Sequence, residues 1–441
     1  MKYFLAIDIG ASSGRHILGY RDGKGEVVLR EIYRFENGAE RRGERLYWNT
    51  EKLFSRVCEG IAKCREIGII PESIGIDTWG VDYALLDKNG KIIDGIISYR
   101  DDRTLGIPEE VYGIVPKREL YRRTGIAEHT FNTIFQLYED KKSGRLASAD
   151  RMLFVPCYLN YLLTGNAVNE YTFASTTGLL DAKTRDWDRD LIELLGLPQK
   201  LFDRLGQPGS VVGMLDPSIA GFTCPVVLPA CHDTASAVAA VPEGKRLWIS
   251  SGTWSLIGIE SDSPCTTEEA ESAGFTNEGG LDGRIRFLKN IMGLWIIQSV
   301  KRELKGQYNY EQLMKFAESS FYEGYLRVDD DRLLSPASMT EAIKSSLADS
   351  GQPAPQDIGD LMKAVYRGLA ASYAEAADSI ERITGERFDT IAIIGGGSRD
   401  RYLNRLTGEL SHRRVVTGSP EATALGNILV QMKSSKKNRG N

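Results

Sequence analysis

Cysteine and histidine are scarce in this sequence, and neither is clustered. The 441 residues include six cysteines and four histidines, with no C-x-x-C pair and no H-x-x-x-H spacing. A chain of this length does not need covalent cross-links, so we predict that the cysteines are reduced thiols. Because transition-metal sites need clustered cysteine or histidine ligands, any metal is predicted to bind through oxygen.

The sequence also lacks an excess of positive charge and any long apolar run. Its formal net charge is -5 at pH 7, unlike the basic chain expected of a nucleic-acid-binding protein. No apolar run approaches the ~18 residues of a membrane span. Asp8 interrupts the segment in which a signal peptide would have its apolar region. We therefore predict a cytoplasmic protein with no nucleic-acid or membrane partner.

Length and composition point to two globular domains. A chain of 441 residues exceeds the size at which one hydrophobic core stops growing. Hydrophobic residues at 42% and charged residues at 26% are ordinary values for a globular protein. Turn residues at 241–247 precede a new strand pattern, so the predicted domains span 1–241 and 242–434, with a flexible tail at 435–441.

The first half begins with strands and then alternates strands with helices. Three strands are predicted within residues 3–34, followed by a helix over 48–68 with Thr50 as its N-cap and Gly68 as its stop. "SIGIDTWG" at 73–80 reads as a buried strand. This order predicts an α/β layer architecture.

The second half opens in the same way as the first. "RLWISSGTWSLIGIE" at 246–260 repeats the design of residues 4–19, which is an apolar strand, a turn of small residues and a second apolar strand. A long amphipathic helix is predicted over 359–385, then a strand over 388–394. The next helix should carry Leu403, Leu406 and Leu410 on one face, whereas 345–357 is predicted to be a surface connection.

The turn in "DIGASSGR" has the chemistry of a phosphate site. Its small residues allow an anion to approach several backbone N–H groups, and Arg15 can contact a phosphoryl oxygen. Asp8 can hold a hydrated magnesium ion beside nucleotide phosphates, or it can merely cap the turn. Two such hairpins facing one another could hold the two ends of a triphosphate. The glycines of "IIGGGSRD" at 393–400 suit an adenosine group or tight strand–helix packing.

Two further segments suit a sugar substrate. "CHDTASAVAAVP" places Asp233 before a helix of small residues, where it can accept a proton from a hydroxyl or simply cap that helix. In "IDTWGVDY", Asp77, Trp79 and Asp82 can grip sugar hydroxyls and a sugar face, although Trp79 can equally be a core aromatic. The charged residues of "YRDDRT" at 99–104 would line the same mouth or be solvated.

Together these segments resemble the FGGY family of carbohydrate kinases, within the superfamily of actin, heat-shock and sugar kinase proteins. The resemblance covers essentially the whole chain. It rests on "DIGASSGR", "IDTWGVDY", "YRDDRT", "CHDTASAVAAVP", "SSGTWSLIGIE", "TNEGG", "FLKNIMGLWIIQ", "GGGSRD" and "EATALGN". It implies an α/β fold of two ribonuclease H-like domains, with ATP and substrate in the cleft between them.

The resemblance also implies roles for individual residues. Asp8 would organise magnesium, and Asp233 would be the catalytic proton acceptor. The ATP-binding residues would be Ala11, Ser12, Ser13, Gly14, Arg15, Thr253, Gln298 and Gly396. With Trp79 and Asp82, the sugar-binding residues would be Gly80, His232, Asp233, Thr234 and Asn290. Ser419 departs from the family's usual "GPxEATA", which affects one loop on the nucleotide side.

The implied activity is ATP-dependent phosphorylation of a ketose, with magnesium, to a sugar 1-phosphate. L-rhamnulose is the expected substrate, and a monomer or homodimer the expected state. Spacing does not reveal sugar stereochemistry, so L-fuculose, D-xylulose and glycerol remain alternatives. A non-catalytic regulator that binds nucleotide and sugar is another, although such a protein would not need Asp233.

Overall fold

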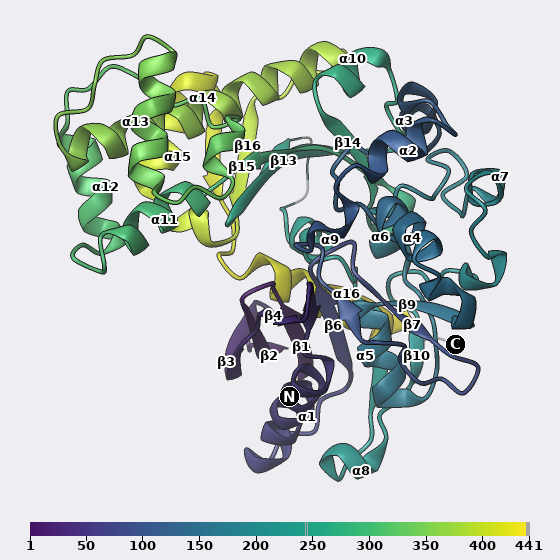
Figure 1. Cartoon of the computed structure of the whole chain (residues 1–441). Helices are drawn as coiled ribbons and strands as arrows, with labels where there is room; N and C mark the ends of the chain where they lie inside the picture. The colour runs from purple at the N-terminus through teal and green to yellow at the C-terminus, as the bar shows by residue number, and fades with distance from the viewer. Residues whose placement is uncertain (243, 245, 438–441) are drawn as a thin grey trace.

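The computed structural model describes residues 1–242, 244 and 246–437, and it contains two six-stranded sheets (Figure 1). The first sheet has the order β10-β11-β6-β1-β2-β3 and the second has the order β14-β15-β13-β12-β16-β17. Two small sheets, β4-β5-β8 and β7-β9, accompany the first. The boundary predicted at 241–247 includes residues 243 and 245, which lie outside the described residues.

The strand bounds are as follows. The first sheet comprises β1 (Phe4–Ile9), β2 (Ser13–Arg21), β3 (Val27–Glu36), β6 (Ile74–Thr78), β10 (Val211–Met214) and β11 (Pro225–Val227). The small sheets comprise β4 (Ala39–Arg42), β5 (Arg45–Trp48), β8 (Ile96–Ile97), β7 (Tyr83–Leu86) and β9 (Arg151–Phe154). The second sheet comprises β12 (Leu247–Ser251), β13 (Trp254–Ser261), β14 (Phe275–Gly279), β15 (Ile285–Met292), β16 (Thr390–Ile394) and β17 (Arg414–Thr417).

Helices surround both sheets. Those that precede the second sheet in the chain are α1 (Thr50–Glu66), α2 (Ile107–Tyr112), α3 (Lys117–Thr124), α4 (Thr133–Lys142), α5 (Val155–Thr164), α6 (Tyr171–Ala174), α7 (Arg189–Leu194), α8 (Pro217–Ala220) and α9 (Asp233–Ala239). Those that follow are α10 (Glu268–Ser272), α11 (Trp295–Glu303), α12 (Tyr310–Ser319), α13 (Met339–Asp349), α14 (Ile358–Thr384), α15 (Arg401–Ser411) and α16 (Ala422–Lys437).

The two large sheets repeat one arrangement, as the sequence predicts. In the first, β1 pairs antiparallel with β2 and parallel with β6, so that Asp8 lies opposite Arg15 on one side and Asp77 on the other. In the second, β12 pairs antiparallel with β13 and parallel with β16. Each half therefore presents one hairpin turn and one parallel-strand end at the same edge of its sheet.

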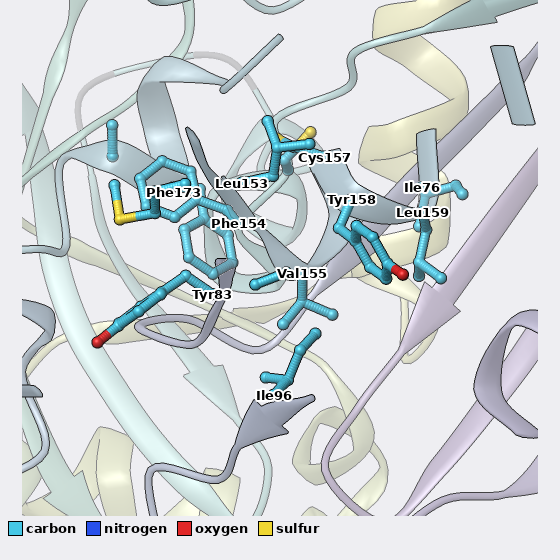
Figure 2. Packing of buried hydrophobic residues seen from close by; sticks show 14 of the residues in the cluster. Ile76, Tyr83, Ile96, Leu153, Phe154, Val155, Cys157, Tyr158, Leu159 and Phe173 are labelled. Atoms are coloured by element: carbon cyan, nitrogen blue, oxygen red, sulfur yellow. The ribbon is translucent and has the colours of Figure 1, made fainter. Parts of the chain in front are cut away.

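The core of the first half is built from β6, β7, β9 and α5. Figure 2 shows Leu153, Phe154 and Leu159 gathered with Ile76 and Tyr83, and all five are buried. The apolar run "MLFVPCYLNYLL" turns directly from β9 into α5, and Pro156 starts the helix where a missing N–H costs nothing. This packing fixes the end of β6, where the "IDTWG" segment emerges.

Several local predictions are confirmed and several need correction. The cap of α1 is Asn49, whose side chain accepts a hydrogen bond from Lys52 N, and Thr50 is the first helical residue. The long helix α14 ends at Gly385, which adopts a left-handed conformation as predicted. Leu403 and Leu406 of α15 are buried, but Leu410, which was predicted on the same face, is 39% exposed. Helix α13 covers 345–349, so the irregular connection is only 350–357.

The last helix returns to the first half of the molecule. In Figure 1, α16 lies against β1 and β6, because Ala424, Ile428 and Met432 pack on Phe4 and Ala6 of β1. The predicted tail is therefore wrong for residues 435–437, which are helical, and 438–441 lie outside the described residues. This helix belongs to the second half in chain order, but it packs against the first sheet.

Two features of the described residues bear on cross-linking and on membrane insertion. The six cysteines are all free, as predicted. Within the described residues, no helix is long and apolar enough to cross a membrane.

We expect Gly426→Ala to destabilise the protein, because α16 and α9 touch there. An added Cβ would lie 1.7 Å from the backbone oxygen of Ser236. In an isolated helix alanine is more favourable than glycine. A loss of stability in this variant would therefore come from the clash with Ser236. The expected loss is about 1–3 kcal/mol in urea unfolding. Gly23→Ala, whose Cβ meets nothing within 4 Å, is the control, and equal midpoints for both variants would contradict the prediction.

Candidate active site

The first hairpin turn brings opposite charges together at the end of β1. Arg15 Nη2 donates to Asp8 Oδ2 at 2.6 Å, and Arg15 Nη1 donates to Glu421, which precedes α16. Burial raises the pKa of Asp8, and the nearby Arg15 opposes that rise. Ser12 is exposed and Ala11 and Ser13 are half-buried at the turn. The turn is therefore accessible, with one cation between two carboxylates.

Gly14 is part of the packing under that turn. It is buried, and an added Cβ would lie 2.1 Å from the ring of Phe35. The turn itself is closed by a hydrogen bond from Gly10 N to Ser13 O at 2.9 Å. Glycine at 14 is thus required by a neighbouring side chain, whatever the turn binds.

The second hairpin turn is joined to α11 and to the glycines after β16. Thr253 Oγ1 lies 3.4 Å from Gln298 Oε1, so the structure brings these two predicted ATP ligands together. A Cβ at Gly397 would lie 2.0 Å from Ser251 Oγ, whereas a Cβ at Gly396 would meet nothing within 4 Å. Gly397 therefore serves tight packing, and Gly396 leaves open backbone beside the hairpin.

Asp233 is the first residue of α9 and lies where β6 and β11 end. Thr234 donates to Asp233 Oδ1 through its backbone N at 2.6 Å and through its hydroxyl at 3.2 Å. The side chain of Asp233 remains 33% exposed. His232 occupies the N-cap position without a side-chain cap bond. The structure thus presents a partly exposed carboxylate, steadied on one oxygen by its neighbour.

Asp77 adds a third carboxylate beneath Asp8 and Asp233. It is fully buried, and Asn427 Nδ2 of α16 donates to its Oδ2 at 2.5 Å. Burial, followed by the charge of Asp8, raises the pKa of Asp77 well above its usual value. Its other oxygen, Oδ1, has no hydrogen-bond partner among the described residues. Asp77 lies under the site and is not placed to bind a sugar hydroxyl directly.

Trp79 and Asp82 form a buried hydrogen-bonded group, which corrects the idea that Asp82 grips sugar hydroxyls. Asp82 is fully buried, and its Oδ2 accepts from Trp48 Nε1 at 2.6 Å and from Trp79 Nε1 at 2.9 Å. Tyr99 N donates to the same oxygen at 3.2 Å. Trp79 is only 6% exposed, which matches the core-aromatic alternative. Burial raises the pKa of Asp82 to about 6.

The "YRDDRT" segment supports that group from behind. Arg103 is buried and donates to Asp140 Oδ1 at 2.7 Å and to Gln136 Oε1 at 2.6 Å. Asp101 is also buried and caps the short helix at Asp102–Thr104. Neither predicted alternative is correct for these two residues, because Arg103 pairs with the buried Asp140 and Asp101 pairs with Arg45 at 3.1 Å.

The remaining predicted sugar ligands come from both halves of the chain. Gly80 is close to His232, since an added Cβ would lie 3.3 Å from His232 Nε2. Asn290 Nδ2 of β15 lies 3.4 Å from His129 Nε2, and His129 stacks on Phe131. His129 and Asn290 also line a cavity of about 300 Å³ that extends toward α3. The structure therefore assembles this side from both halves of the chain.

Sequence reasoning missed five residues that hold the site together. They are Glu170, Glu278, Arg286, Glu421 and Asn427. Glu170 accepts a hydrogen bond from Cys231 N at 3.1 Å, just before the His-Asp-Thr triplet, and burial raises its pKa to about 7. Glu278, Glu421 and Asn427 stand inside the motifs "TNEGG" and "EATALGN", which was the available signal. No local pattern indicated their partners.

No group of three or more His, Cys, Asp or Glu side chains in the described part of the chain is arranged to hold a metal ion. Asp8 lies at the end of β1 just before the phosphate-type turn, and its carboxylate oxygens suit a hydrated magnesium ion.

Comparison with known proteins follows the same division into halves. Residues 3–240 match the N-terminal domain, and residues 247–435 the C-terminal domain, of the FGGY family of carbohydrate kinases. Rhamnulokinase from Oceanobacillus iheyensis is 45% identical, over 97% of this chain and 92% of its own. Rhamnulokinase from Halalkalibacterium halodurans is 44% identical, over 98% of this chain and 93% of its own.

A solved structure supports the fold. Ligand-bound xylulose kinase from Lactobacillus acidophilus superimposes with a TM-score of 0.83 at 16% identity, covering 99% of this chain and 90% of that one. The predicted two-domain α/β fold is confirmed. By sequence and by fold, this chain belongs to the FGGY family of carbohydrate kinases.

Proposed function

We propose that the chain is an ATP-dependent kinase that transfers phosphate to the 1-hydroxyl of L-rhamnulose. The observation that carries the reaction type is Asp233, a partly exposed carboxylate beside a phosphate-type turn and beside His232 and Thr234. The relatives named Rhamnulokinase, at 45% and 44% identity over nearly the whole chain, support the substrate. The product would be L-rhamnulose 1-phosphate.

Asp233 would accept the proton of the attacking hydroxyl. Phosphoryl transfer has a loose transition state, so placement of the base matters more than its basicity. Thr234 holds Oδ1, and Oδ2 has no hydrogen-bond partner among the described residues. Oδ2 is therefore available to a sugar hydroxyl, while His232, Gly80 and Asn290 would hold the rest of the sugar.

ATP and magnesium would occupy the space between the two hairpin turns. Magnesium neutralises charge on the transferred phosphate, and Asp8 offers the hard oxygen ligand that this ion prefers. Arg15 already lies between Asp8 and Glu421, so it can turn toward a phosphate oxygen. The accessible turn at 11–13 and Thr253 would contact the phosphates, with Gln298 and Gly396 on the far side of the nucleotide.

Asp82 would act through Trp79, without touching the sugar. Its carboxylate receives N–H bonds from both Trp48 and Trp79, which fixes the indole of Trp79 next to Gly80. Trp79, which is 6% exposed, would therefore support Gly80 from within the core, and Asp82 would fix the position of Trp79.

We also propose that residues 1–241 and 242–434 act as two domains about this cleft, as a monomer or homodimer in the cytoplasm. One chain supplies all the candidate residues, which supports function without a partner subunit. The return of α16 to the first sheet means that the second domain contributes its last helix to the first.

Asp233→Asn should abolish sugar-dependent ADP release while leaving ATP binding intact. Loss of a general base costs about 10²–10⁴-fold in rate. Turnover would be measured by a coupled ADP assay and ATP binding by calorimetry. Asp262→Asn, whose side chain is 90% exposed, is the control. Full activity of Asp233→Asn would refute the assignment and would favour a non-catalytic regulator.

A substrate panel would test the sugar. With ATP and magnesium, we expect rapid ADP release with L-rhamnulose and little with L-fuculose, D-xylulose, glycerol or no sugar. Turnover with a different sugar alone would keep the mechanism and change the substrate.

The buried Asp82 should titrate near pH 6 and be visible in tryptophan fluorescence. Because its pKa is raised to about 6, the folded protein holds this proton more tightly than the unfolded chain. Its contribution to stability is full below about pH 4 and is lost as the pH rises through 6. We expect an emission change near pH 6 that Asp82→Asn lacks, and an identical titration in that variant would disprove the assignment.

A further inference from the structure

The backbone just before Asp233 is held by two side chains from a distant part of the first half. Glu170 precedes α6 and is fully buried, and its Oε2 accepts a hydrogen bond from Cys231 N at 3.1 Å. Thr172 lies in α6 and is also fully buried, and its Oγ1 accepts from His232 N at 3.4 Å. The last two backbone N–H groups before Asp233 are therefore both bonded to side chains of this segment.

The two side chains are also bonded to each other, and this bond makes both of them acceptors toward the backbone. Thr172 donates the one proton of its hydroxyl to Glu170 Oε2 at 2.7 Å, so its lone pairs face His232 N. Glu170 accepts in addition from Thr172 N at 2.7 Å and from Phe173 N at 3.0 Å. Four donors thus converge on the Glu170 carboxyl, which suits its ionised form, because an ionised carboxylate only accepts.

The carbonyl groups of the same two residues are bonded as well. Thr78 N, at the end of β6, donates to Cys231 O at 2.9 Å. Ser236 N of α9 donates to His232 O at 3.0 Å. Every backbone polar group of Cys231 and His232 therefore has a partner, whereas the side chain of Asp233, which follows them, is 33% exposed.

The short helix that carries Thr172 is anchored on two sides. Tyr171 N donates to Gly206 O at 3.0 Å. Ser175, which follows α6, donates from its hydroxyl to Thr172 O at 2.7 Å and accepts from Gly279 N of β14 at 2.7 Å. The support of the backbone before Asp233 is therefore fixed in its own place, partly by a strand of the second sheet.

We propose that Glu170 and Thr172 are positioning residues for the base: they hold the backbone of Cys231 and His232 so that the Asp233 carboxylate stays within reach of the attacking hydroxyl. This inference rests on the proposed sugar kinase function. Neither positioning side chain would touch the sugar or ATP. Because transfer depends on the exact placement of the base, loss of the support would slow transfer and leave ATP binding intact.

The test removes the hydroxyl of Thr172. Thr172→Val keeps the shape of the side chain but takes the acceptor from His232 N and one donor from Glu170. Thr172→Ser is the conservative variant, because it retains the hydroxyl. Thr407→Val is the matched control, because Thr407 is also fully buried and its hydroxyl donates to Leu403 O of α15 at 2.8 Å. Thr172→Ala removes the same hydroxyl without a new methyl group, and it is used if the valine variant does not fold.

We expect Thr172→Val to lose at least ~10-fold in kcat for L-rhamnulose with KM for ATP unchanged, because a small displacement of a catalytic group costs this much or more. Thr172→Ser should recover most of that loss, and Thr407→Val should keep the unmodified kcat. In an Asp233→Asn background, Thr172→Val should lower the residual rate no further, because residues that act as one unit are not additive. An equal loss in that background, or no loss in Thr172→Val, would overturn the inference.

Amide hydrogen exchange of the full chain, read by mass spectrometry, tests the support without depending on activity. We expect residues 229–236 to exchange faster in Thr172→Val and in Glu170→Gln, because a neutral amide is a weaker acceptor than a carboxylate. Thr407→Val should leave the exchange of this segment unchanged. Unchanged exchange of 229–236 in the first two variants would overturn the inference. If the unmodified protein phosphorylates no sugar but both variants exchange faster there, the proposed function fails and the support of the Cys231 and His232 backbone stands.

Discussion

Three carboxylates crowd the carboxyl ends of β1, β6 and β11, and the side chains that face them limit their mutual repulsion. Asp8 and Asp77 are register partners on adjacent parallel strands, and Asp233 follows β11. Burial and like charge raise the pKa of Asp8 and of Asp77. Such a cluster is costly unless cations or hydrogen-bond donors face it. Arg15 and Asn427 supply those partners, and a magnesium nucleotide would supply more.

The two partners reach the carboxylates from very different parts of the chain. Arg15 follows immediately in the first hairpin, whereas Asn427 comes from α16 near the C-terminus. Gln431 extends this hydrogen-bond network, because it donates to Asn427 Oδ1 at 2.6 Å and accepts from Ser73 Oγ at 2.7 Å. Because α16 also packs its apolar face on β1, the helix that follows Glu421 lies directly against the strand that carries Asp8.

Around His232 the crossing between the halves runs in the opposite direction. There the second sheet sends its edge strand β14 onto the first half, with hydrogen bonds on both sides of Glu278. Each half thus supplies an element that packs against the other: α16 lies under Asp8 and Asp77, and β14 lies beside His232. This arrangement fits a kinase that must hold two substrates in one alignment.

Local chemistry in the sequence determined the α/β class, the repeated hairpins and the placement of Asp8, Arg15 and Asp233, because strand period, turn glycines and motif spacing act over short stretches. It could not distinguish Asn49 from Thr50 as a cap, since both are good caps. Asp82 and Glu278 needed the tertiary structure. Asp82 has a side chain of the kind that binds sugar hydroxyls, but Trp48 and Tyr99 enclose it. Glu278 contacts His232, which is 46 residues away in the sequence. Burial and long-range pairing decide such roles, and both arise only when distant segments pack together.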